Sequence, residues 1–154
     1  MGSSDSHNLV KNTYDVGRSY IHRTMTLVLA KERSEASIKE ALIAGRTVAW
    51  ASKYLAGKEE HVRSLFNACV DLMPSHYSEP VKDGISTNYY EIKNKSDLYF
   101  DLELRTGKGT GKIILYPHST QLISAVSGQN SLTYEVMTAY VRSDKHLVVD
   151  LPLE

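Results

Sequence analysis

The sequence has little that points to a disulfide, a nucleic-acid partner or a membrane. A single cysteine, Cys69, excludes an internal disulfide and leaves the redox compartment open. Lys plus Arg and Asp plus Glu both number 18, so no basic excess attracts phosphate backbones. No apolar run approaches the roughly 20 residues that span a bilayer, and the N-terminus lacks the basic and apolar segments of a secretory signal. We therefore expect no nucleic-acid partner and no membrane span.

The N-terminal half alternates strand-like and helix-like segments. Residues 24–30 form a short apolar run rich in β-formers, which is typical of a buried strand. Ser34 is a suitable N-cap for a helix that ends near Gly45, and residues 46–51 have the pattern of a second strand. The apolar residues of this helix follow the i, i+3, i+4 spacing: Ile38, Ala41 and Leu42. A strand, helix and strand joined this tightly predict a βαβ unit, usually with parallel strands.

A second helix is predicted to begin near residues 57–60 and to end before Pro74. Its apolar stripe consists of Val62, Leu65, Phe66 and Cys69. From about residue 85 the hydrophobic period changes to two, as in a half-buried strand. The alternation is clearest at Leu98, Phe100, Leu102 and Leu104, and further strands are predicted over 89–92, 113–116, 120–126, 132–141 and 146–151. This many short strands with intervening turns predict a small antiparallel sandwich.

Several residues with chemical potential have simpler explanations. The glycines at 107, 109 and 111 suggest a phosphate loop, but Gly111-Lys112 is followed by Ile113 and a strand, so a hairpin turn is favoured. Cys69 lies on the apolar stripe of its helix, where an inert thiol is expected. Packing in the sheet explains the tyrosines better than a base-stacking platform does. Surface or packing roles are expected for five scattered histidines: His22, His61, His76, His118 and His146.

Asp5 and His7 form an Asp-x-His pattern near the start of the chain. Two such side chains at the end of a strand can both point at one metal ion. Taken alone, the pattern is weak, and a solvated polar tail is the favoured explanation, because Ser3, Ser4 and Ser6 surround it. The order of the segments that follow favours the metal-site interpretation.

Residues 2–70 resemble the C-terminal end of a PHP domain, the polymerase and histidinol phosphatase family of metal-dependent phosphoesterases. The segments that carry the resemblance are SDSHN at 4–8, HRTMTLV at 22–28, AKERS at 30–34, IKEAL at 38–42, AGRTVAW at 44–50 and GKEE at 57–60. The β half resembles the small immunoglobulin-like extension that follows some bacterial PHP domains. The resemblance implies a distorted β/α barrel that gathers His, Asp and Glu ligands around two or three divalent ions.

By this resemblance, Asp5 and His7 would be metal ligands, and the ion would be Zn, Mn, Fe or Mg. Metal ions in such a site activate a water molecule for hydrolysis of a phosphate ester, the substrate class of the intact protein. The upstream His-x-His and acidic ligands of the family pattern are absent from this sequence. Two ligands do not make a closed site, so we expect no firmly bound ion and no activity from this chain alone.

The sequence therefore predicts an α+β protein, a short βαβα segment followed by an antiparallel immunoglobulin-like β-sandwich. Residues 1–75 would be the remnant of the PHP-type barrel, residues 76–84 a linker, and residues 85–154 the immunoglobulin-like domain. The predicted function is that of a C-terminal fragment of a phosphoesterase in the bacterial cytoplasm or periplasm. Unpaired strand edges of an incomplete barrel would favour self-association. The alternative is a non-catalytic binding or assembly module, with Asp5 and His7 in a tail.

Overall fold

The computed structural model describes residues 2, 23–81 and 84–153. Within these ranges the chain forms two helices and eleven strands, in the order β1 (Met25–Val28), α2 (Glu35–Ile43), β2 (Thr47–Ala51), β3 (Tyr54–Gly57), α3 (Glu59–Cys69), β4 (Val70–Leu72), β5 (Tyr77–Pro80), β6 (Ser86–Asn94), β7 (Phe100–Thr106), β8 (Lys112–Leu115), β9 (Thr120–Val126), β10 (Ser131–Arg142) and β11 (Lys145–Pro152). Neither of these helices has the length and apolar character needed to cross a membrane.

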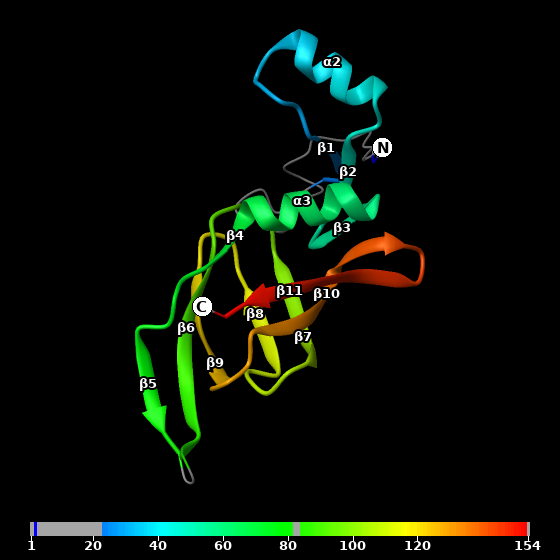
Figure 1. Ribbon diagram of the computed structural model, residues 1–154. Helices are drawn as coiled ribbons and strands as arrows, with labels where there is room; N and C mark the ends of the chain where they lie inside the picture. The colour runs from blue at the N-terminus through cyan, green and yellow to red at the C-terminus, as the bar shows by residue number, and fades with distance from the viewer. Residues whose placement is uncertain (1, 3–22, 82–83, 154) are drawn as a thin grey trace.

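The strands form two sheets. The larger sheet has the order β1-β2-β3-β10-β7-β8, with β11 also paired to β10. The smaller sheet has the order β4-β6-β5, with β9 paired to β6. Strand β10 runs antiparallel to β7 and β11 but parallel to β3, through Ala139 and Leu55. One sheet therefore continues from the N-terminal α/β segment into the β half, and α3 lies across the end of the sandwich (Figure 1).

The predicted first helix is confirmed. Ser34 caps α2, because its Oγ accepts a hydrogen bond from the Ser37 backbone N–H at 3.2 Å. Gly45 follows the helix with a φ of +69°, a conformation that favours glycine. Helix α2 therefore begins and ends where the sequence signals place it.

The predicted parallel pairing of the first two strands is wrong. Met25 pairs with Trp50 and Val28 with Thr47, so β1 and β2 are antiparallel. The Leu29 N–H donates to the Arg46 carbonyl at 2.9 Å. This bond joins the two ends of the segment that contains α2. Helix α2 buries little surface, so it projects from a hairpin-like connection instead of crossing over the sheet (Figure 1).

Strand β3 was not predicted as a separate element. It follows β2 through a tight turn in which Ser52 has a φ of +54°. The turn has none of the glycine or asparagine residues that usually mark a hairpin in the sequence. The pairing of β3 with β10 then extends the larger sheet.

Helix α3 is confirmed, with Val62, Phe66 and Cys69 buried on one face. His61, for which a surface or packing role was expected, is buried beside them. The packing of α3 against both β3 and β11 covers more of the helix surface than a single stripe.

The β half has the predicted antiparallel, immunoglobulin-like fold class, and every predicted strand is present. Leu98, Phe100 and Leu102 are buried, as the period-two alternation requires. Strand β5 lies within residues 76–84, where the sequence suggested a linker. The division of the chain at this segment stays a prediction.

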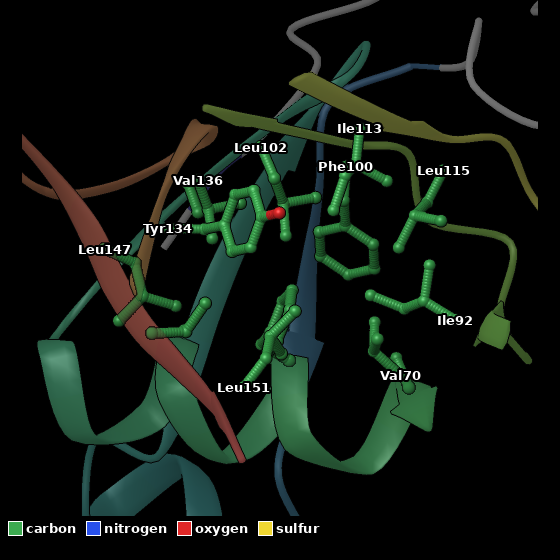
Figure 2. Close-up of a cluster of buried hydrophobic side chains, with 14 of the residues drawn as sticks. Val70, Ile92, Phe100, Leu102, Ile113, Leu115, Tyr134, Val136, Leu147 and Leu151 are labelled. Carbon is green, nitrogen blue, oxygen red and sulfur yellow. The ribbon is translucent and has the colours of Figure 1, made fainter. Parts of the chain in front are cut away.

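Among the described residues, one hydrophobic core fills the space between the sheets and α3 (Figure 2). Phe100 of β7 meets Phe66 of α3 edge-on, with the ring centroids 5.2 Å apart. The smaller sheet contributes Ile92, which is fully buried. The core thus joins the α/β segment to the sandwich.

The loop between β7 and β8 connects the two sheets. Gly109 pairs with Ala125 of β9, and the Thr110 N–H donates to the Ser124 carbonyl at 2.9 Å. A Cβ at Gly109 would lie 2.4 Å from the Ser124 carbonyl oxygen. Only glycine lets the backbones approach this closely.

We predict that Gly109→Ala lowers the free energy of unfolding by about 1–3 kcal/mol, because backbone or side chains must move to admit the methyl group. The control is Gly111→Ala, where a Cβ meets nothing within 4 Å. It should change stability by less than about 1 kcal/mol. Urea unfolding of both variants measures the difference, and equal midpoints would contradict the packing argument.

Candidate functional site

The predicted metal ligands, Asp5 and His7, lie outside the described residues. The described residue nearest to them in the sequence is Gly2, which contacts β1. Its N–H donates to Thr26 Oγ1 at 2.9 Å, and the same hydroxyl donates to the Gly2 carbonyl at 2.9 Å. A Cβ at Gly2 would lie 3.2 Å from the Cβ of Ala49 on β2. Residue 2 therefore sits directly on the surface of the larger sheet.

Each of three histidines lies beside a carboxylate. His118 Nε2 is 2.8 Å from Asp97 Oδ1 on the surface, and His61 Nε2 is 3.3 Å from Glu60 Oε1. His76 Nε2 is 3.9 Å from Glu91 Oε1. Across residues 23–81 and 84–153, no three His, Cys, Asp or Glu side chains gather to hold a metal ion. The described part of the chain supplies pairs of donors, but not a metal centre.

The glycine-rich segment is a turn, as predicted, and not a phosphate loop. It joins the antiparallel strands β7 and β8. Gln129 closes the turn, since its Oε1 accepts from the Lys108 N–H at 2.5 Å and its Nε2 donates to the Lys108 carbonyl at 2.7 Å. No helix follows the glycines to present its N-terminus to a phosphate.

A hollow of about 540 Å³ lies between α3, β4 and β11. Two carboxylates line it, Asp71 and Asp150. Asp71 pairs with Lys95 at 2.9 Å, and Asp150 accepts a hydrogen bond from Thr133 Oγ1 at 2.6 Å. Both carboxylates therefore have protein partners, which suits a structural role better than an acid–base role.

Two pairs of tyrosines pack against each other on or beside the strands of the larger sheet. Tyr54 packs on Tyr140, and Tyr99 meets Tyr116 at 76° between ring planes. Lys53 Nζ lies 5.4 Å from the Tyr54 ring centroid and 5.8 Å from that of Tyr99. The rings pack against each other in tilted and edge-on pairs, in agreement with the packing interpretation.

Tyr134 is fully buried in the core. Its hydroxyl donates to the Thr110 carbonyl at 2.6 Å, and burial raises its pKa to about 12. At neutral pH it is a protonated donor that ties β10 to the β7–β8 loop. Nothing in the local sequence pattern predicts this contact, since Tyr134 follows the ordinary strand alternation.

Comparison with known proteins identifies the β half. Residues 70–152, more than half of the chain, match a family described as an Ig-like domain, DUF5001. The chain belongs to this Ig-like family. Its antiparallel sheets around one core are the architecture that the family description implies.

A solved structure from Bacteroides vulgatus extends the similarity to the whole chain. That protein is described as a two-domain protein containing a predicted PHP-like metal-dependent phosphoesterase. The match has a TM-score of 0.83 and 30% sequence identity, and covers 99% of this chain and 45% of that one. The resemblance to a PHP-type protein with an Ig-like extension is thereby confirmed, and this chain spans less than half of the relative's length. Curated protein sequences give no match.

The Cys69 thiol is buried, as predicted, and desolvation raises its pKa, although Ser96 and Lys95 oppose the shift. Because the thiolate is the reactive form, we predict that Cys69 reacts slowly with Ellman's reagent at pH 8 in the folded protein. Unfolding in urea should accelerate the reaction by about 100-fold or more. Fast reaction of the folded protein at pH 7 would contradict the burial of this thiol.

Proposed function

We propose that this chain is the C-terminal part of a metal-dependent phosphoesterase that hydrolyses a phosphate ester. The observation that carries the proposal is the match of 99% of this chain to part of the Bacteroides vulgatus protein. In this proposal Asp5 and His7 contribute two ligands to a divalent metal site, and the ion is Zn, Mn, Fe or Mg. The intact protein would act in the bacterial cytoplasm or periplasm.

The described residues do not fit a complete metal site, because they bring no three suitable donors together. The remaining ligands would have to come from protein outside this chain. The chain alone therefore has no means of holding a metal ion firmly, since two donors leave most of its coordination positions open.

The Ig-like domain would serve as a support for the phosphoesterase part. Residues 1–75 would be the end of the α/β domain and residues 85–154 the extension. The β3–β10 pairing and the packing of Phe66 on Phe100 join these two parts rigidly. An extension fixed in this way would hold the last strands of the α/β domain in place.

We predict that the purified chain does not hydrolyse bis(p-nitrophenyl) phosphate with Mn²⁺ or Zn²⁺ added. Isothermal titration calorimetry should show weak metal binding or none, for the same lack of donors. His118→Ala serves as a control for adventitious surface binding at the His118–Asp97 pair. Turnover that is abolished both by a chelator and by His7→Ala would contradict the inactivity of the isolated chain.

A chimera tests the positive part of the proposal. In it, this chain replaces the matched region of the Bacteroides vulgatus protein. If Asp5 and His7 are metal ligands, His7→Ala should lower phosphoesterase activity by at least about 10- to 100-fold, the loss seen even for outer-shell partners of a metal site. His118→Ala should retain activity. Equal activity of the two variants would contradict the assignment.

The alternative is a non-catalytic binding or assembly module. The Ig-like match over residues 70–152 favours it, because this domain type serves many functions without catalysis. Both functions predict an inactive isolated chain. Only the phosphoesterase function predicts a chimera whose activity depends on His7, so the chimera distinguishes them.

A further inference from the structure

Helix α2 is held to the rest of the protein by little contact. It has nine residues, and Ala41 is the only one buried. Its larger apolar side chains are exposed, Ile38 by 40%, Leu42 by 41% and Ile43 by 89%. Isolated helices shorter than about 12–15 residues are marginal in water, and proteins stabilise them by packing an apolar face. The helix therefore carries an apolar surface that lacks a covering element among the described residues.

Two ion pairs lie on and beside α2. Lys39 Nζ lies 2.6 Å from Glu35 Oε1, and Arg46 forms an ion pair with Glu40. Beside them, Ile38 lines a hollow of about 430 Å³ together with Val28 and Ala30, and the charged residues Glu32 and Arg33 also line it. The exposed Ile38, Leu42 and Ile43 offer apolar surface to a partner, so burial of this surface would favour its binding.

Strand β1, next to this helix, has an edge that pairs with no strand among residues 23–81 and 84–153. The hydrogen bond from the Leu29 N–H to the Arg46 carbonyl shows which residues of β1 bond to β2. In an antiparallel pair these residues alternate with residues whose backbone N–H and C=O groups point away from the partner strand. In β1 the residues with groups pointing away are Thr26 and Val28. In the described sheet no strand pairs with that side of β1. An unpaired edge is a template for another strand.

We propose that the β1 edge and the apolar side chains of α2 form one docking surface for the remaining α/β part of the phosphoesterase. This inference rests on the proposed function and names the partner of the chain. The Bacteroides vulgatus protein supports this occupant, because it contains a further 55% of polypeptide (100 − 45) beyond the region matched here. A strand of that part pairs with β1, and its apolar side chains cover Ile38 and Leu42.

Cysteine labelling tests the docking surface without reference to activity. Leu42→Cys is the reporter, and the control is Leu122→Cys on β9, whose leucine is 60% exposed. Cys69 is buried and contributes little background. In this chain alone both new thiols should react rapidly with a maleimide. In the chimera, Leu42→Cys should react at least about 10-fold more slowly, while Leu122→Cys keeps its rate.

Ile38→Cys is a second reporter and should follow Leu42→Cys. Equal rates at Leu42→Cys in the chimera and the isolated chain would overturn the proposal, and so would a chimera that aggregates. Protection of Leu42→Cys in a dimer of the isolated chain would also overturn it, since a second copy would then be the occupant. If the chimera is inactive but Leu42→Cys in it reacts slowly with the maleimide, the proposed function is contradicted and the docking surface is supported.

Discussion

The parallel pairing of β3 with β10 is the interaction on which the rest of the structure depends. Ala139 and Tyr140 pair with Leu55 and Ala56, while other residues of β10 bond to β7 and β11. The α/β segment is thereby built into the main sheet of the Ig-like domain. Helix α3 reinforces the junction, since Arg63 donates to the Val148 carbonyl of β11 at 2.9 Å. A segment joined in this way cannot rotate as a separate body without breaking sheet hydrogen bonds.

Local patterns in the sequence were sufficient for most of the elements. The cap at Ser34 and the alternation of Phe100 and Leu102 depend on neighbouring residues only, and both are confirmed. The direction of β2 could not be obtained in this way, because a strand-helix-strand sequence is compatible with either pairing direction. The missed turn at Ser52 and the buried His61 likewise depend on contacts with distant strands.

The family resemblance was predicted from the order of short segments, and the comparisons confirm it. The metal site was predicted less completely than the family. Asp5 and His7 lie outside the described residues, so their role as ligands stays a prediction. A metal centre gathers donors from distant parts of a protein, and this chain contains only a part of the relative's length. The spacing of two residues can suggest such a centre, but it does not identify the other ligands.

The central claim is that β3 and β10 form one cooperative unit, whereas few contacts hold α2 to the rest of the described structure. Native-state hydrogen exchange of the isolated chain tests it most directly. The account predicts that amides of β3 exchange as slowly as those of β10, at the rate of global unfolding, and that amides of α2 exchange at least about 100-fold faster. Exchange of β3 together with α2, separately from β10, would contradict it.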